Sequence, residues 1–523
     1  MHFEFLALTA SIISSTLVSA QSASVTLKQG VYVGSTRSFP SSAVQVNQFK
    51  RVRYASQPER FGPPKPVAPS SQQFEATGNA PSCPQGALGI QSEDCHFLNL
   101  WTPANAGTNS SKAVMVFYYG GGLQVGGIDQ GGRYDGANLA ANEDIIVITP
   151  NYRVNLFGFP GIVQGIPKDG RNPGFLDQHF VLDWIQENIA AFGGDPKRVM
   201  ISGQSGGGAS TSFLLMSSPS PKFHSAVVES GSGYLFASDW SGLENVLTGG
   251  AMPARALPDN FKTLAAGINC TTGDETATLD CVKKAPVRAL QDASAAAKLQ
   301  WGPAPDGGIT VPDDLDTAHK EGKIAKVPII AGTTSKEGGL FNIRASITEF
   351  GKAVAAGNTT LEQMFADAYT FGTGEKFANE ADAKVQVMTD MMFTCLTAHE
   401  MELRINGGET SIYRYFFSAP SPPRGPVHGA DIPYLFGTAS TTDPSSIELT
   451  QTIQHAFANF AKDPAAGPGW AKFGATDGMG IAELGGAGNR GGSKEMKVQD
   501  VDGRCNMFFP RYERSFVPLK GLV

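Results

Sequence analysis

The chain has 523 residues, of which 41% are hydrophobic and 17% charged, with 61 glycines and 33 prolines. This composition is typical of a globular protein with many turns, and it excludes a disordered chain, a collagen-like repeat and a coiled coil. The formal net charge of −7 gives no basic excess, so we expect no nucleic-acid partner and no stable membrane association. After position 20 no apolar run is long enough to span a bilayer.

The first 20 residues resemble a secretory signal peptide. An apolar run from Phe3 to Val18 precedes Ser19 and Ala20, small residues of the kind that a signal peptidase recognises. The segment has no Lys or Arg and contains Glu4, which leaves a buried first strand or helix as the alternative. We expect residues 1–20 to be removed and residues 21–523 to form the secreted protein.

Two further features fit an extracellular protein. The six cysteines are even in number and show neither Cys-x-x-Cys nor a zinc-binding spacing, which favours disulfides in an oxidising compartment. Candidate glycosylation sites are the three Asn-x-Ser/Thr sequons, at Asn109, Asn269 and Asn358.

Short apolar runs bounded by Gly, Pro or Asn recur along the chain and predict buried strands. In chain order they are Ala113–Tyr119, Ile145–Thr149, Val199–Ser202, Ala226–Val228 and Val327–Ala331. Between the second and third, apolar residues at three- and four-residue spacing predict a helix over Phe175–Phe192. This order predicts one large α/β domain, 21–523, with a largely parallel sheet between layers of helices. The segment Gly485–Gly492 is expected to be a mobile surface loop that does not pack.

A candidate nucleophile lies in Gly203-Gln204-Ser205-Gly206-Gly207. A chain this rich in glycine can match Gly-x-Ser-x-Gly by chance, so the setting decides. The sequence follows the strand Val199–Ser202 and precedes a predicted helix, Gly206–Met216, which is the strand–turn–helix context that the motif needs. Flanking glycines allow Ser205 to adopt a strained turn that exposes its hydroxyl at the carboxyl edge of the sheet.

A second glycine-rich turn, Tyr119-Gly120-Gly121-Gly122-Leu123, follows the first predicted strand. Glycines there allow main-chain N–H groups to approach a substrate carbonyl oxygen, as an oxyanion hole requires. A tight loop without function is the alternative.

An activated serine needs a base to take its proton and a carboxylate to orient that base, and here the expected chain order is Ser, acid, His. Of the histidines after Ser205, His224 comes directly after the predicted helix that follows the serine, which is too early for the order serine, acid, histidine. His319 precedes a charged segment. His399 and His455 lie in helix-like stretches, whereas His428 lies in a loop flanked by Pro and Gly. His428 is favoured, but spacing alone leaves the choice open.

Several segments, in order, resemble the type-B carboxylesterase/lipase family, the cholinesterase-like α/β-hydrolases, and in particular secreted fungal members. The resemblance extends from Ala55 to Phe508. Its most specific segments are Glu93–Asn99, Tyr119–Gly122, Asn151–Arg153, Asn188–Pro196, Thr334–Gly338 and His428–Tyr434. The resemblance implies an α/β-hydrolase fold, with a large, mostly parallel twisted central sheet flanked by helices.

The same resemblance implies residue roles. Ser205 is the nucleophile, Glu337 the orienting acid and His428 the general base, and no metal or other cofactor is needed. Ser230 resembles a serine that supports the acid, although a turn serine is the alternative. The oxyanion hole would consist of the backbone N–H groups of Gly121, Gly122 and Gly206. Relatives usually have alanine at position 206, and no loss of function is expected because the donor is main chain.

Cysteine pairing is also implied by the resemblance, since sequence alone permits any pairing of six cysteines. The implied disulfides are Cys83–Cys95, Cys270–Cys281 and Cys395–Cys505. The first closes only the short, tryptophan-free segment Pro84–Asp94, where family lipases and cholinesterases have a longer loop that serves as a lid or contacts choline. We therefore expect hydrolysis of soluble, small-molecule esters with short to medium acyl chains.

Three alternatives stay open. A lipase or sterol esterase would act on long-chain esters, and a non-catalytic adhesion protein could use the same fold. A peptidase is disfavoured by analogy with this fold's usual pocket architecture. The natural ester and the oligomeric state are not predicted.

Overall fold

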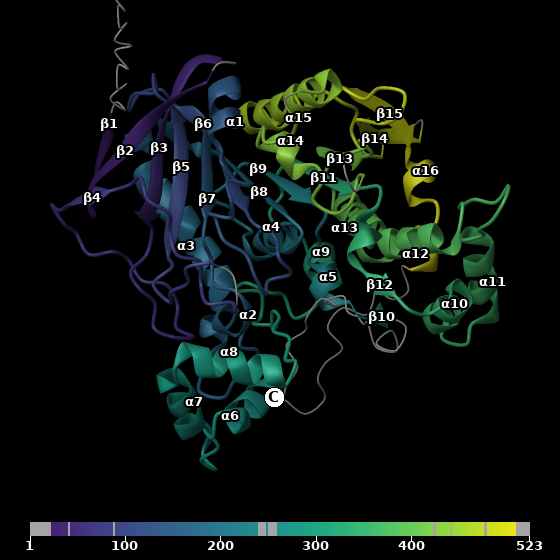
Figure 1. The fold of residues 1–523 in the computed structure, drawn as a ribbon, viewed down its shortest axis with the longest axis horizontal. Helices are drawn as coiled ribbons and strands as arrows, with labels where there is room; N and C mark the ends of the chain where they lie inside the picture. Colours follow the sequence, from purple (N-terminus) through teal and green to yellow (C-terminus); the bar gives the residue numbers. More distant parts are fainter. Residues whose placement is uncertain are drawn as a thin grey trace, which may run out of the picture.

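The computed structural model describes residues 22–39, 42–86, 89–238, 247–248, 259–421, 425–440, 442–474 and 478–508. In these residues one large sheet runs through the molecule in the order β1-β2-β3-β5-β7-β6-β8-β9-β11-β13-β14-β15, with β4 paired to β2 at its side. Figure 1 shows this twisted sheet between layers of helices. The expected α/β-hydrolase architecture is therefore confirmed.

The middle of the sheet is parallel and buried on both faces, which explains why its strands are continuous apolar runs. All five strands predicted from the sequence belong to this part. Its members are β6 (Lys112–Tyr118), β7 (Ile146–Pro150), β8 (Gly194–Gln204), β9 (Ser225–Glu229), β11 (Ile329–Thr334), β13 (Ile412–Phe417) and β14 (Met479–Leu484).

The sheet continues as antiparallel strands at both ends. In β1 exposed and buried residues alternate, as in a strand with one face in solvent, so a search for continuous apolar runs does not find it. The additional strands are β1 (Ser22–Leu27), β2 (Gly30–Phe39), β3 (Ser42–Arg53), β4 (Gln73–Glu75), β5 (Phe97–Pro103) and β15 (Ser493–Lys497), and a separate pair is formed by β10 (Leu247–Thr248) and β12 (Asn342–Ile343).

Helices α1 and α15 pack on one face of the sheet, and α3, α4 and α13 pack on the other (Figure 1). In the described ranges no helix is both long and apolar enough to cross a membrane. The helices are α1 (Ala137–Glu143), α2 (Asn155–Gly158), α3 (Pro173–Asn188), α4 (Gly206–Ser217), α5 (Tyr234–Ala237), α6 (Asn260–Gly267), α7 (Glu275–Lys284), α8 (Val287–Ala296), α9 (Leu315–Lys320), α10 (Ile347–Ala355), α11 (Thr359–Ala368), α12 (Glu380–Thr389), α13 (Cys395–Asn406), α14 (Ile432–Leu435), α15 (Pro444–Lys462) and α16 (Val498–Asp502).

The predicted helix Phe175–Phe192 forms α3 followed by a 3-10 turn, Ile189–Phe192. Gly193 then adopts a left-handed conformation with φ of 86° and ends the turn. This conformation favours glycine, so the stop signal was correctly interpreted. The helix directs the chain back into β8, and β8 leads to the candidate nucleophile.

Three disulfides are present, Cys83–Cys95, Cys270–Cys281 and Cys395–Cys505, as the family resemblance implied. The second lies within a small apolar cluster of its own, built around α6, α7 and α8, which Figure 1 shows below the main body. The third joins α13 to a 3-10 turn 110 residues later in the chain.

The expectation that Gly485–Gly492 does not pack is wrong at both ends of the segment. The segment is the turn between antiparallel β14 and β15. A Cβ on Gly485 would lie 2.6 Å from the Cβ of Ala419, and one on Gly491 would lie 2.1 Å from Oε2 of Glu448. Glycines are therefore needed there because the backbone approaches its neighbours closely, while residues 487–490 are exposed.

Candidate active site

Ser205 lies between the end of β8 and the start of α4. Its backbone has φ of 59° and ψ of −123°, a strained conformation for a residue other than glycine. Two hydrogen bonds fix this turn, from Ser205 N to Glu229 O at 2.8 Å and from Ala209 N to Ser205 O at 2.9 Å. A Cβ on Gly207 would lie 2.0 Å from Tyr118 O, so glycine there lets α4 start directly against the sheet.

Glu337 begins a 3-10 turn, Glu337–Leu340, that follows β11. Its side chain is fully buried, and Oε1 accepts hydrogen bonds from Oγ of Ser230 and from Thr334 N, both at 2.6 Å. Ser230 is itself fully buried. The Ser230 hydroxyl thus donates directly to the carboxylate of Glu337, a contact that a supporting role would require.

His428 lies in the segment between β13 and α14, and its Nδ1 is 2.5 Å from Oε2 of Glu337. Because a carboxylate can only accept, Nδ1 carries the proton and the lone pair of a neutral imidazole lies on Nε2. The ring of Phe393 packs against the imidazole with centroids 4.8 Å apart. A backbone hydrogen bond from Lys336 N to Pro426 O, 3.0 Å long, joins the two segments that carry the pair.

The other imidazole nitrogen makes no hydrogen bond to Ser205 among the described residues. Nε2 of His428 lies 3.0 Å from Nε2 of Gln204, so the amide donates to the imidazole lone pair. Within the described part of the chain, Oγ of Ser205 makes no hydrogen bond. Sequence reasoning missed Gln204 as a site residue. The available signal was its place in the motif, directly before the serine.

The glycine turn after β6 lies next to the start of α4. Gly121 and Gly122 have φ of 122° and 62°, which glycine tolerates. A Cβ on Gly206 would lie 3.0 Å from Gly122 N and 2.9 Å from Leu123 N, so the two segments are in close contact. The N–H groups of Gly121, Gly122 and Gly206 donate to no acceptor in the described residues, and the N-terminus of α4 adds a positive dipole end.

Two further carboxyl groups are buried behind the site. Burial, together with the negative charge of Asp431, raises the pKa of Glu229 well above its usual value. Burial also raises the pKa of Asp431, and Tyr415 opposes this rise by donating to Oδ2 of Asp431 at 2.7 Å. The main-chain oxygen of Glu229 also accepts the hydrogen bond from Ser205 N, so this buried pair lies next to the backbone that anchors the serine.

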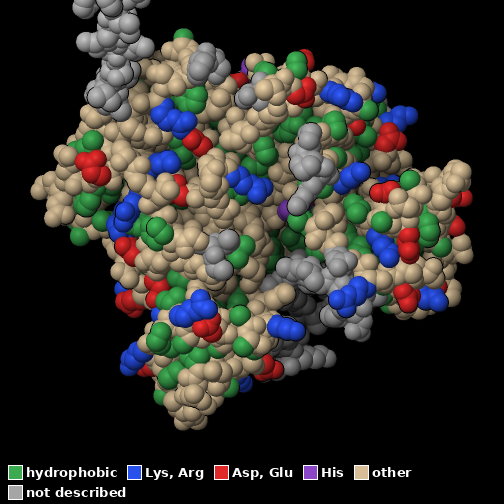
Figure 2. Space-filling model, in the orientation of Figure 1, with side chains coloured by type: hydrophobic (Ala, Val, Ile, Leu, Met, Phe, Trp, Pro, Cys, Tyr) green, Lys and Arg blue, Asp and Glu red, His purple; other side chains and the backbone are tan. Residues whose placement is uncertain are grey.

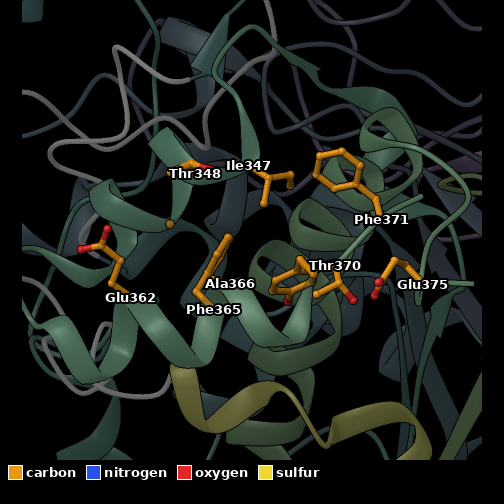
Figure 3. Close-up of a pocket in the computed structure, with 10 residues that line it drawn as sticks. Ile347, Thr348, Glu362, Phe365, Ala366, Thr370, Phe371 and Glu375 are labelled. Atoms are coloured by element: carbon orange, nitrogen blue, oxygen red, sulfur yellow. The ribbon is translucent and has the colours of Figure 1, made fainter. Parts of the chain in front are cut away.

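The cavity drawn in Figure 3 is separate from the candidate active site. It has a volume of about 330 Å³ and lies between α10 and α11, with Phe365 and Phe371 among its lining residues. No member of the candidate site lines it. In the described ranges, no three His, Cys, Asp or Glu side chains form a group that could hold a metal ion.

All three sequon asparagines are exposed. Asn358 also caps α11, because its Oδ1 accepts from Leu361 N at 3.1 Å. This bond uses only the side-chain oxygen, so Nδ2 of Asn358 is left for attachment of a glycan.

Comparison with known proteins identifies the family. Residues 21–482 match the model of the carboxylesterase family. Para-nitrobenzyl esterase of Bacillus subtilis (strain 168) is 30% identical over 443 residues, which are 80% of this chain and 86% of that protein. Carboxylesterase 1D of Mus musculus is 29% identical, over 79% of this chain and 80% of its own length. A solved structure titled PNB esterase superposes with a TM-score of 0.72 at 26% identity and covers 93% of this chain and 99% of its own.

Some relatives do not have an esterase name. Neuroligin-2 of Mus musculus is 27% identical over 80% of this chain, and the match spans 57% of that longer protein. The esterases match over most of their own length, as does the solved esterase structure. The chain belongs to the carboxylesterase family and is a carboxylesterase.

Proposed function

We propose that the protein hydrolyses carboxylic esters with Ser205 as nucleophile, His428 as general base and Glu337 as the acid that orients it. The observation that carries this proposal is the 2.5 Å contact between Nδ1 of His428 and Oε2 of Glu337, beside a serine in a strained strand-to-helix turn. A histidine oriented in this way has its second nitrogen available as a base, which a serine hydroxyl requires.

In the first step Oγ of Ser205 attacks the ester carbonyl carbon while Nε2 of His428 takes the hydroxyl proton. The carbonyl oxygen becomes an oxyanion, which accepts hydrogen bonds from the N–H groups of Gly121, Gly122 and Gly206. Collapse of this intermediate breaks the bond to the alcohol oxygen, and His428 gives its proton to the leaving alcohol. For this step Ser205 must replace Gln204 as the hydrogen-bond partner of Nε2.

In the second step water attacks the acyl-enzyme. His428 takes a proton from water, the same N–H groups stabilise the second oxyanion, and the carboxylic acid leaves as Oγ of Ser205 regains its proton. Glu337 stabilises the imidazolium that forms in both steps, and Ser230 holds Glu337 in place. No metal or other cofactor takes part.

We propose that the substrates are soluble small-molecule esters with short to medium acyl chains. This proposal is supported by the short segment that the Cys83–Cys95 disulfide closes. The side chain of Gln85 attaches that segment to Gly126 through two hydrogen bonds, 2.6 Å and 2.5 Å long. A segment so short and so attached does not serve as a long lid. A lipase or sterol esterase that prefers long acyl chains is the alternative.

We further propose that the protein is secreted as a single catalytic domain, residues 21–523, after removal of residues 1–20, which lie outside the described residues. Three disulfides and three exposed sequons, at Asn109, Asn269 and Asn358, support this route. Amino-terminal sequencing of protein secreted by a eukaryotic host is expected to begin at residue 21. Enzymatic removal of N-linked glycans is expected to lower the mass, and Asn→Gln variants identify the modified positions.

Covalent labelling with a fluorophosphonate tests the catalytic assignment, because such probes phosphorylate an activated serine. The wild-type protein is expected to be labelled once, and Ser205→Ala to be unlabelled although folded. Ser110→Ala, which removes a surface serine, serves as the control and is expected to be labelled like wild type. If the folded wild-type protein is not labelled, the non-catalytic alternative on the same fold gains support instead.

A further inference from the structure

An arginine lies beside the proposed base. Arg133 belongs to the loop between the glycine turn and α1, and its side chain reaches Gly429, the residue after His428. A Cβ placed on Gly429 would lie 2.9 Å from Nη2 of Arg133 and 3.2 Å from Nε2 of Gln204. Nε2 of Gln204 is in turn 3.0 Å from Nε2 of His428. The guanidinium of Arg133 therefore lies near the Gln204 amide that meets Nε2 of His428, the nitrogen from which a leaving alcohol would receive its proton.

Glycine at position 429 makes this approach possible. Its φ of 73° is a conformation that favours glycine. Any side chain at this position would meet the guanidinium of Arg133 within 3 Å. The lack of a side chain at residue 429 leaves space for the guanidinium in the position that it takes here.

Arg133 has no counter-ion among the described residues. No carboxylate forms an ion pair with it, and its contact is with the ring of Tyr134, 5.7 Å from the guanidinium carbon to the ring centroid. Some arginines of the chain are paired, for example Arg153 with Asp177 and Arg60 with Glu93. Glu337, the carboxylate of the proposed triad, is fully buried on the Nδ1 side of the imidazole.

Arg133 and Gln204 together therefore present N–H donors and one positive charge beside His428. The side chain of Gln204 is neutral, so it does not neutralise the charge of Arg133. Arg133 is exposed to solvent. Figure 2 shows Lys and Arg side chains spread among acidic and hydrophobic ones over the drawn face of the molecule. A guanidinium fork is well matched to the two oxygens of a carboxylate.

We propose that Arg133 is a specificity-determining residue that binds a carboxylate on the alcohol part of the ester. This inference rests on the proposed function, because His428 marks the alcohol side only if it protonates the leaving group. The preferred substrates are then esters whose alcohol carries a negative charge near the ester bond. Arg133 acts by contact with the substrate, and Gln204 adds amide donors next to it.

Three aryl acetates with the same skeleton test the proposal: 3-acetoxybenzoate is anionic, 3-acetoxybenzamide is neutral and 3-acetoxy-N,N,N-trimethylanilinium is cationic. We expect Arg133→Gln to lower kcat/KM for the anionic ester relative to the neutral one by about threefold to fivefold, the range for an ion pair open to solvent. For the cationic ester, kcat/KM relative to the neutral ester is expected to rise in Arg133→Gln. Arg133→Lys keeps the positive charge and is expected to retain part of the selectivity for the anionic ester. Salt is expected to weaken the wild-type preference, because ions screen exposed charges.

Arg490→Gln is the matched control, since it removes the same charge from an exposed turn between β14 and β15. It is expected to leave the ratio of anionic to neutral rates unchanged. An equal ratio in wild type and Arg133→Gln would overturn the proposal. A selectivity that appears only with a carboxylate in the acyl part, as in 4-nitrophenyl hydrogen glutarate, would also overturn the assignment to the alcohol side.

A binding measurement separates this inference from the proposed function. Ser205→Ala and Ser205→Ala/Arg133→Gln are titrated calorimetrically with 3-acetoxybenzoate and with the amide. We expect only the first variant to bind the carboxylate more tightly than the amide, by about threefold to fivefold. Equal binding of the two compounds by Ser205→Ala would contradict the inference. Failure of the wild-type protein to hydrolyse the neutral ester would contradict the proposed function alone.

Discussion

Nε2 of His428 lies 3.0 Å from Nε2 of Gln204, the residue immediately before Ser205. The imidazole is therefore hydrogen-bonded on both nitrogens, to Glu337 through Nδ1 and to a neutral amide through Nε2. A neutral partner at Nε2 adds no charge that would favour the imidazolium. Gln204, the residue between Gly203 and Ser205, is therefore in direct contact with the nitrogen that must act as the base.

Replacement of Gln204 by Glu is expected to shift the pH dependence of activity. A carboxylate beside Nε2 stabilises the charged imidazolium over the neutral base, because opposite charges attract. Since the base must be neutral to act, activity is then lost at a higher pH than in wild type as the pH falls. The measurement is kcat/KM for a neutral ester against pH. Gln45→Glu on β3 is the control, and an unshifted acidic limb in Gln204→Glu would contradict the account.

Ser230 supplies one of the two hydrogen bonds that fix Oε1 of Glu337. Ser230→Ala leaves a buried carboxylate oxygen with one donor fewer, which weakens its hold on His428. We expect kcat to fall about tenfold with little change in KM. Ser225→Ala on the same stretch of chain is the matched control, because Oγ of Ser225 is buried without a partner. Equal losses in both variants would show that the effect is structural and not due to Glu337.

Gly206 allows the glycine turn to approach the start of α4. In Gly206→Ala the added Cβ would lie 2.9 Å from Leu123 N and 3.0 Å from Gly122 N, so the turn must move. Displacement of oxyanion donors lowers kcat, and loss of one donor costs about a hundredfold or more. A small shift of the turn is expected to lower kcat by about tenfold. Gly78→Ala, where nothing lies within 4 Å of the new Cβ, is expected to be neutral. Unchanged kcat in Gly206→Ala would contradict this packing.

His319 is expected to make the fold sensitive to acid. Burial lowers its pKa to about 4, and its Nδ1 lies 2.8 Å from Leu315 O. In the unfolded chain the pKa returns to about 6.5. Between these values the unfolded state binds a proton that the folded state does not, so the free energy of unfolding falls as the pH decreases from about 6.5 to 4.

Denaturant unfolding of His319→Asn at several pH values tests this expectation. Asparagine can still donate to Leu315 O, and the variant is expected to lose less stability than wild type between pH 7 and 4.5. The exposed His455 provides the control variant His455→Asn, which is expected to follow the wild-type curve. An identical pH dependence in all three proteins would contradict a role for His319.

The sequence predicted five of the parallel strands in the centre of the sheet because they are buried on both faces and read as continuous apolar runs, such as Ile146–Pro150. The parallel strands β13 and β14 were not predicted. The sequence also predicted Ser205, because a strand, a Gly-x-Ser-x-Gly turn and a helix are consecutive in the chain. The antiparallel strands β1 to β3 were missed, because a strand with one solvent face alternates and gives no such run.

Glu337 and His428 came from family resemblance and not from spacing. They lie 91 residues apart in the chain and meet only because β11 and β13 are neighbours in the sheet. Gln204 and Arg133 were not singled out for a similar reason. The roles proposed for these two residues depend on their closeness to His428 and Gly429. The three segments that carry them come together only when the chain folds.

Initial rates on 4-nitrophenyl esters from acetate to palmitate, for wild type and Ser205→Ala, test the central claim most directly. The account predicts rates that are highest for acetate to butyrate and that vanish in Ser205→Ala. Highest rates on long chains, rising above the solubility limit, would contradict the soluble-ester assignment and indicate a lipase. Hydrolysis that persists undiminished in a folded Ser205→Ala variant would contradict the assignment of Ser205 as nucleophile.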